Sequence, residues 1–354
     1  MSATMKIVNF FRKCEFLQIS GRKTRFWNAS SSGIHTTTNR KDDSPTEITE
    51  QTSVIRDVEG IFLNPRVQEI LLKITGIDAH KVNRPRKERL KPPKYELLSD
   101  EQLKQVQAEA MKTVVNKLKM PPVMNPRKQI ETVLTKNPEL EGLDDCKFLF
   151  TDISPGHSDR ERLIIAREPD GTLRNASWAE RQKALQIYFP KHGRKLRTPH
   201  MFEEEHLNRI LKEERYEYIL ERALIQFEPD DPHYIHITHK VYDFINDKKH
   251  FDHLRSTRHF GCMTLHFTIQ KTINNLLVDT LQSDLLDNAA DLVRLYTIVH
   301  PECATSQTIK DNASMDSLEL IKIYAEKDAT HHQQGDIELA LQSYEEVHPE
   351  VSTS

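Results

Sequence analysis

Apolar residues recur at intervals of three and four along much of the chain, which is the spacing of one face of an α-helix. The first clear case begins at Asn64, which can cap a helix, has Pro65 in the first helical position and ends at Gly76. Its apolar face consists of Val67, Ile70, Leu71 and Ile74. The pattern predicts a short amphipathic helix in this segment.

Two further helices are predicted before residue 140. Ser99 is followed three residues later by Gln102, the arrangement of a capping box, and Pro121 stops the helix that they begin. The apolar face of this helix consists of Leu103, Val106, Ala110, Val114 and Leu118. Residues 126–134 are predicted to form a short third helix that ends at Asn137.

The middle of the chain changes character. Residues 147–153 are rich in aromatic and β-branched side chains, and two similar runs lie on either side of Pro169, Asp170 and Gly171 within residues 162–176. Pro-Asp-Gly between such runs predicts a turn, so we expect a β-hairpin that pairs with the earlier strand. A helix capped by Ser177, with Glu180 at the capping-box position, is predicted to follow.

Beyond Thr198 the pattern is helical to the end of the chain. A long apolar stripe predicts one helix over 278–299. A shorter stripe consists of Leu220, Ala223, Leu224 and Phe227. Only 10 glycines and 29% charged residues also favour helices with solvated faces. The predicted fold is α-rich (α+β), with amphipathic helices and one small embedded antiparallel β module around residues 147–176.

The first 35 residues differ in composition from the rest. They contain six basic residues, one acid and many Ser and Thr, with a short apolar stretch over 7–11. This composition is typical of a mitochondrial transit peptide, and no apolar run there is long enough for a secretory signal or a membrane span. The alternative is a basic arm that binds nucleic acid. Cleavage between Trp27 and His35 would change the net charge from −3 to about −8.

The predicted order of segments follows from these patterns. It is a transit peptide over 1–35, a flexible lead-in over 36–60, a helical region with a basic strap and the hairpin over 61–198, an all-helical region over 199–345, and an acidic or polar tail over 346–354. Residues 301–354 contain eleven acids and three lysines. This negative charge favours contact of this end of the chain with basic proteins or water over contact with RNA.

Residues 80–95 form the most basic segment, which we call the strap. It holds seven Lys or Arg, one Glu and three prolines that exclude a regular helix. An extended basic segment can follow a phosphate backbone; the alternative is a solvated linker. The candidate contact residues of the strap are Arg84, Arg86, Lys87, Arg89 and Lys91.

Two other basic clusters are candidates for RNA contact. The first consists of Lys191, Arg194, Lys195 and Arg197. The second consists of Arg255, Arg258 and His259 beside Phe260. An arginine with an adjacent aromatic ring suits phosphate contact and base stacking. A cluster of this kind taken alone is more often a solvated face.

Motifs for enzyme chemistry are missing from the sequence. The glycine spacings match no GxGxxG, GxxxxGK or GxSxG pattern. Four cysteines, Cys14, Cys146, Cys262 and Cys303, lie far apart and form no CxxC pair, so neither a zinc ribbon nor a redox dithiol is indicated. No catalytic residue and no cofactor are predicted.

Histidines form the one cluster with metal-ligand chemistry. They are His233, His236, His239, His250, His253, His259 and His266. A metal site needs three or four converging ligands, and no HExxH motif occurs, so surface or packing roles are favoured and no metal is predicted.

The run over 148–195, FLFTDISPGHSDRERLIIAREPDGTLRNASWAERQKALQIYFPKHGRK, resembles the family of mitochondrion-specific small-subunit ribosomal proteins numbered twenty-two, found in animal mitochondria. Further similar stretches are LKPPKY over 90–95, LKMPPV over 118–123, QFEPD over 226–230 and LRSTRHFG over 254–261. The resemblance extends from about Ile61 to about Tyr344, and the FTDIS and REPDGTLR runs are specific. Residues 155–159 depart from the usual family sequence.

The resemblance implies a structural protein of the mitochondrial small ribosomal subunit, located in the matrix and without known catalysis. The implied partners are the small-subunit ribosomal RNA and neighbouring mitochondrial ribosomal proteins, with no membrane and no small-molecule substrate. We expect the strap to touch RNA or a negatively charged neighbour, and the helical C-terminal half to contact other proteins.

Two other hypotheses come from different classes of protein. A soluble matrix enzyme would require a pocket that gathers His and carboxylate side chains. A peripheral inner-membrane adaptor would require a helix with a basic polar face, because anionic lipid repels an acidic one. The polar side of the 278–299 stripe instead carries Asp279, Asp284, Asp287 and Asp291.

Overall fold

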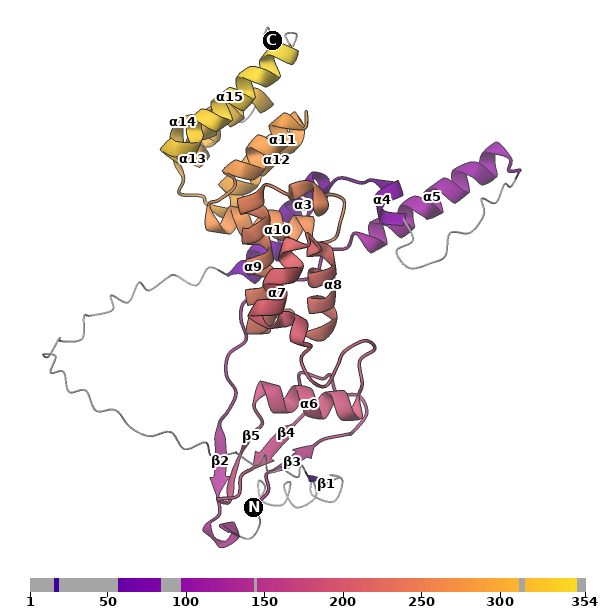
Figure 1. The fold of residues 1–354 in the computed structure, drawn as a ribbon, viewed down its shortest axis with the longest axis vertical. Coiled ribbons are helices and arrows are strands. Elements are labelled where there is room, and N and C mark those ends of the chain that lie inside the picture. The colour runs from indigo at the N-terminus through magenta and orange to yellow at the C-terminus, as the bar shows by residue number, and fades with distance from the viewer. Residues whose placement is uncertain (1–15, 19–56, 84–96, 143–144, 312–315, 349–354) are drawn as a thin grey trace, which may run out of the picture. The chain divides into compact units, whose positions relative to one another are not determined.

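The structure, a computed structural model, describes residues 16–18, 57–83, 97–142, 145–311 and 316–348 (Figure 1). The chain divides into two compact units. The sheet unit comprises residues 128–196 with the N-terminal segment, and the helical unit comprises residues 57–127 and 197–354. The helical unit is therefore built from two separate stretches of chain.

The sheet unit contains a small antiparallel sheet, as predicted. The strand order is β1-β3-β4-β5-β2. The strands are β1 Phe16–Gln18, β2 Val133–Lys136, β3 Phe148–Thr151, β4 Ile164–Arg167 and β5 Thr172–Asn175. Gly171 (φ 76°) makes the predicted turn between β4 and β5, and the carbonyl oxygen of Asn137 lies where a side chain at this position would go. Glycine is therefore required there.

The predicted helix over 126–134 is wrong. Residues 121–132 belong to no helix or strand, and β2 follows them. The backbone N–H of Arg127 donates to the carbonyl of Asp230, and the carbonyl of Thr132 accepts from Asn175. Because these groups are bonded to distant segments, they are not available to a local helix.

Helix α6 (Trp178–Tyr188) begins at the predicted capping box of Ser177 and Glu180. It covers a small core that consists of Leu149, Ile164, Ala166, Ala176 and Ala184. Glu180 also accepts hydrogen bonds from Arg174 and Lys147. Although burial alone would raise the pKa of Glu180, these bonds lower it to about 2.

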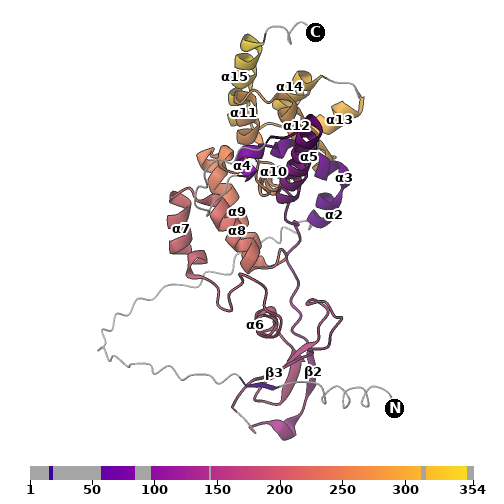
Figure 2. The same ribbon diagram turned by 90° about the vertical axis from the view of Figure 1, so that its right-hand side faces the viewer.

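The helical unit contains the larger core (Figure 2). Its helices in the first stretch are α2 Val58–Leu63, α3 Pro65–Thr75, α4 Ala79–Asn83 and α5 Asp100–Lys117. Those in the second stretch are α7 Glu204–Lys212, α8 Tyr216–Gln226, α9 Pro232–Lys248, α10 Phe260–Gln270, α11 Asn274–Gln282, α12 Leu286–Val299, α13 Ala304–Asp311, α14 Ser317–Lys327 and α15 His331–Val347. Short 3₁₀ turns are η2 Pro138–Leu140 in the sheet unit and η3 His200–Phe202 and η4 Phe251–His253 in the helical unit.

Helix α3 begins and ends as predicted, with Asn64 as its cap and Gly76 after its last turn. Its predicted apolar face is buried, and it packs against α10 and α12. This packing explains why residues 57–127 belong to the helical unit, whereas the sequence patterns had placed them with the β module in one region over 61–198. The junction at residues 196 and 197 lies beside the predicted boundary at 198.

The predicted single helix over 278–299 is wrong, because two helices share its stripe. Helix α11 ends at Gln282 and α12 begins at Leu286, with Asp284 in the left-handed region (φ 60°) between them. Most of the stripe is nevertheless buried in the core. Helix α15 packs against α11, and α14 packs against α12.

The α-rich α+β fold is thus confirmed. The predicted transit peptide lies outside the described residues, apart from β1. That strand forms one edge of the sheet, where it pairs with β3 alone, and the four other strands pair without it. None of the described helices is both long and apolar enough to cross a bilayer.

Candidate RNA and protein interfaces

The strap begins in α4, and its five candidate contacts, Arg84, Arg86, Lys87, Arg89 and Lys91, lie outside the described residues. Lys81 in α4 is described. Its ammonium group donates to the carbonyls of Asp252 (2.8 Å) and Arg255 (2.6 Å), and burial lowers its pKa. The start of the strap is therefore attached to the helical unit.

Lys191, Arg194 and Lys195 lie in the loop that follows α6. The side chain of Gln186 organises this loop, because its amide donates to the carbonyl of Arg194 (3.1 Å) and its oxygen accepts from the backbone of Lys191 (3.2 Å). Lys191 also pairs with Asp159 (3.2 Å). Lys191 and Lys195 are exposed, whereas Arg194 is half-buried. Arg197 begins the second stretch of the helical unit and is exposed.

Arg255 and Arg258 are committed to ion pairs within the helical unit. Arg255 pairs with Asp252 (2.9 Å) and with Asp279 (2.6 Å). Arg258 forms a bidentate pair with Glu221, which also lies 3.2 Å from His259. The nearby ring of Phe260 is fully buried and cannot stack on a base. Arg255 and Arg258 are therefore already paired within the helical unit, as Lys191 is paired with Asp159 in the sheet unit.

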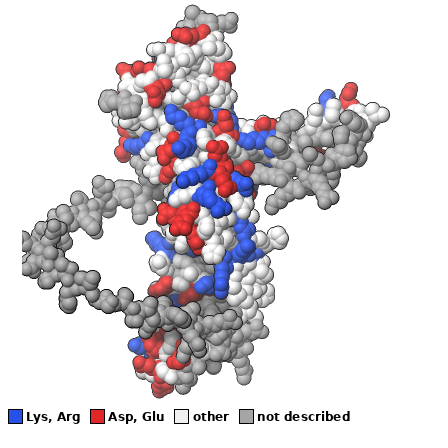
Figure 3. Space-filling model, in the orientation of Figure 1, with Lys and Arg blue, Asp and Glu red and all other residues white. Residues whose placement is uncertain are grey.

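Charges of both signs are mixed on the face of the described residues that Figure 3 shows. On the face drawn in Figure 3, lysine and arginine side chains alternate with acidic ones and form local groups only. Such a surface suits contacts at separate points better than binding along one continuous basic groove.

Helix α5 presents an apolar face with few partners in its own unit. Its capping box of Ser99 and Gln102 is formed as predicted. Of the predicted apolar face, only Val114 and Leu118 are buried, while Leu103 and Val106 are 45% and 50% exposed. The apolar side chains that remain accessible are the kind that a neighbouring protein covers.

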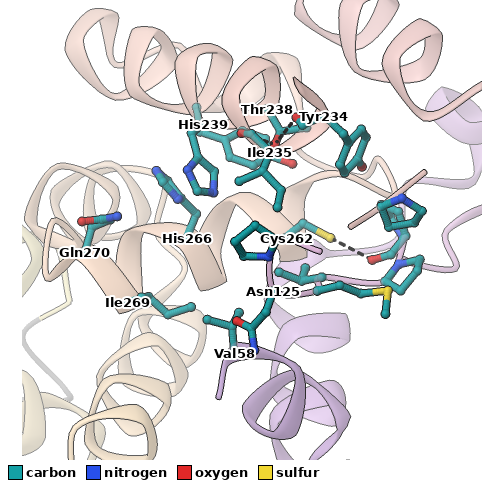
Figure 4. Close-up of a pocket in the computed structure, with 17 residues that line it drawn as sticks. Val58, Asn125, Tyr234, Ile235, Thr238, His239, Cys262, His266, Ile269 and Gln270 are labelled. Atoms are coloured by element: carbon teal, nitrogen blue, oxygen red, sulfur yellow. Dashed lines mark hydrogen bonds between the residues drawn. The ribbon is translucent and has the colours of Figure 1, made fainter. Parts of the chain in front are cut away.

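A cavity of about 210 Å³ lies between α9, α10 and the extended segment after α5 (Figure 4). His239 and His266 lie side by side on its wall, with ring centroids 4.2 Å apart. Burial, with a smaller effect of His266, lowers the pKa of His239 to about 4. Burial also lowers the pKa of His266, so the site favours the neutral form of both rings.

The chemistry of this cavity does not match that of a hydrolytic or redox site. The thiol of Cys262 donates to the carbonyl of Pro121 (3.4 Å), and burial raises its pKa to about 12, so it is not a nucleophile. No Asp or Glu is among the described residues that line the cavity. Outside the lining, the carboxylate of Asp243 lies 3.0 Å from Nε2 of His266.

Comparison with known proteins shows the family of this chain. The family model described as "Mitochondrial 28S ribosomal protein S22" matches residues 60–301. The chain is 44% identical over 286 residues to a protein of Bos taurus named "Small ribosomal subunit protein mS22", with 80% of this chain and 79% of that protein covered. It is also 44% identical over 287 residues to the Mus musculus protein of the same name, with 81% and 79% covered. The chain therefore belongs to the family of mitochondrial small-subunit ribosomal proteins S22.

Proposed function

We propose that this chain is a structural component of the mitochondrial small ribosomal subunit in the matrix, where it supports mitochondrial translation through contacts with ribosomal RNA and neighbouring ribosomal proteins. The observation that carries the proposal is the family match over 60–301, together with 44% identity to two proteins named for this subunit. Proteins of this family have a structural role, and we propose no enzymatic role for this chain.

Separate parts of the chain suit contact with RNA and contact with proteins. The strap and the cluster of Lys191, Arg194, Lys195 and Arg197 supply the positive charge that RNA contact needs. Arg255 and Arg258 remain candidates, although acidic neighbours pair with them, as Asp159 pairs with Lys191. The exposed apolar face of α5 supplies the kind of surface that protein contact needs. Contacts of these two kinds are what a protein that bridges RNA and proteins must make.

The test of the proposal is sedimentation of a mitochondrial lysate through a sucrose gradient at low and moderate salt. We expect the chain to sediment with the small-subunit ribosomal RNA at both salt concentrations, because an integral subunit protein is held by many contacts. A peak at the top of the gradient at both salt concentrations would contradict the proposal and favour a soluble matrix protein.

The RNA role of the strap has a separate test. Reversal of four charges, Arg84→Glu, Arg86→Glu, Lys87→Glu and Arg89→Glu, is expected to shift the chain toward the top of the gradient at moderate salt. Each lost phosphate contact should reduce the slope of the logarithm of RNA affinity against the logarithm of salt concentration by about 0.7 to 0.9.

A matched control reverses four exposed basic residues of the helical unit that lie far apart in the sequence. They are Arg66, Lys212, Lys248 and Lys271. The control changes the net charge equally and should sediment as the unaltered chain does. Equal behaviour of the two quadruple variants would show that net charge matters and that the strap makes no specific contact.

A further inference from the structure

Two of the histidines in the sequence cluster meet a carboxylate from a distant segment. Glu214 lies between α7 and α8, His250 follows α9, and His253 ends η4. One possible ligand atom from each of the three lies within 4.8 Å of the other two. The spacing of the histidines alone indicated no metal site because the carboxylate comes from elsewhere in the chain.

The distances in this cluster suit a metal better than direct bonding between the side chains. Glu214 Oε1 lies 3.8 Å from His250 Nδ1, and Glu214 Oε2 lies 3.6 Å from His253 Nε2. Both distances are too long for a hydrogen bond. Around a tetrahedral zinc ion with bonds of about 2.1 Å, neighbouring ligand atoms are about 3.4 Å apart. Small side-chain movements would therefore create that geometry.

The backbone and one buried side chain hold the cluster in place. Glu214 and Lys249, which precedes His250, both have φ of 58°, an uncommon conformation that sets the direction of the chain at each ligand. The hydroxyl of Tyr216 lies 2.9 Å from His250 Nδ1, and its ring meets that of His253 edge-on at 5.5 Å. Tyr216 is fully buried, and its ring contacts the imidazoles of both His250 and His253. Because its hydroxyl bonds the His250 nitrogen that faces Glu214, a metal ion at that nitrogen would replace this hydrogen bond.

We infer that Glu214, His250 and His253 bind a divalent transition-metal ion, with zinc as the ion that best fits two imidazoles and one carboxylate. The three side chains are 50%, 33% and 45% exposed, so an ion can enter from solvent. The fourth position would hold water or a side chain of a neighbouring protein. A bound ion would join the connection between α7 and α8 to the segment after α9. This role would be additional to the RNA and protein contacts of the proposed function.

The inference is tested by titration of the purified, metal-free full chain with Zn²⁺ against a chromophoric chelator, and with Co²⁺ followed by visible absorption. We expect one site per chain, and loss of that site in a His250→Ala, His253→Ala double variant. In Glu214→Gln, which removes a charged ligand, affinity should fall by more than the about 10- to 100-fold that loss of an outer-shell partner costs. Zn²⁺ should also raise the thermal midpoint of the unaltered chain but not that of the double variant.

The control is His236→Ala, which removes an exposed histidine of α9 outside the cluster and should leave the affinity for Zn²⁺ unchanged. Far-ultraviolet circular dichroism without metal should show that all variants are folded to the same extent. The inference is overturned if the folded chain binds no Zn²⁺, or if the double variant binds it as tightly as the unaltered chain.

Discussion

Replacing Asp231 by alanine is expected to lower the free energy of unfolding of the helical unit by about 3 to 5 kcal/mol. Asp231 accepts from Arg127 (2.6 Å) with one oxygen and from the backbone N–H of His233 (3.0 Å) with the other. The side chains of Arg127 and Asp231 are only 9% and 3% exposed. The substitution therefore removes a helix cap of α9 and takes from a buried guanidinium group the carboxylate at 2.6 Å, while Asp230 lies 3.9 Å away.

Urea unfolding followed by circular dichroism measures this effect, and two variants separate its parts. Asp231→Asn keeps an oxygen that can cap α9 but removes the charge, so it should cost less than Asp231→Ala. Asp247→Asn removes an exposed charge from the same helix and should change the stability by less than about 0.5 kcal/mol. If Asp231→Ala were as mild as Asp247→Asn, the buried pair would contribute nothing measurable.

Replacing Glu221 by glutamine is expected to cost roughly 3 kcal/mol at neutral pH and almost nothing near pH 2. Although burial alone would raise the pKa of Glu221, hydrogen bonds from His259 and Arg258 lower it to about 2, against an ordinary value of 4.5. Between these two values the unfolded chain binds more protons than the folded chain. Stability from this group is therefore complete above pH 4.5 and is lost as the pH falls toward 2.

The measurement is the free energy of unfolding from urea titrations between pH 3 and pH 7. The difference between the unaltered chain and Glu221→Gln should shrink as the pH falls, whereas Glu205→Gln, an exposed position on α7, should match the unaltered chain throughout. A difference that stays constant with pH would mean that the Glu221 carboxylate is not stabilised by Arg258 and His259.

Local signals in the sequence were sufficient where they set the structure by themselves. The cap at Asn64 with Pro65, and the capping boxes after Ser99 and Ser177, give the starts of α3, α5 and α6 correctly. The turn at Gly171 is equally local, because its conformation admits hardly any other residue. In each case the residues that decide the structure are neighbours in the chain.

Predictions failed where distant segments decide the structure. Strand β2 forms because β5 lies beside it, and no residue within 126–134 carries that information. The break at Asp284 was missed because the apolar spacing of three and four continues across it.

Distant segments also decide which side chains meet at the candidate sites. Arg255 and Arg258 look like an RNA-binding pair in the sequence, but their partners Asp279 and Glu221 lie on other helices and neutralise them. Glu214 joins His250 and His253 only through the fold. Charge clusters in a sequence therefore indicate where basic groups occur but not whether their charges are already paired.

The split of the helical unit around the sheet unit affects the order in which the chain can fold. Residues 128–196 are continuous, so their hairpins can close as soon as this part of the chain has entered a compartment N-terminus first. Helix α3 enters earlier, yet its partners α10 and α12 enter much later. Until then its apolar face is uncovered, and closure over so long a sequence separation is slow. A chain that enters a compartment N-terminus first would therefore expose the apolar face of α3 until α10 and α12 follow.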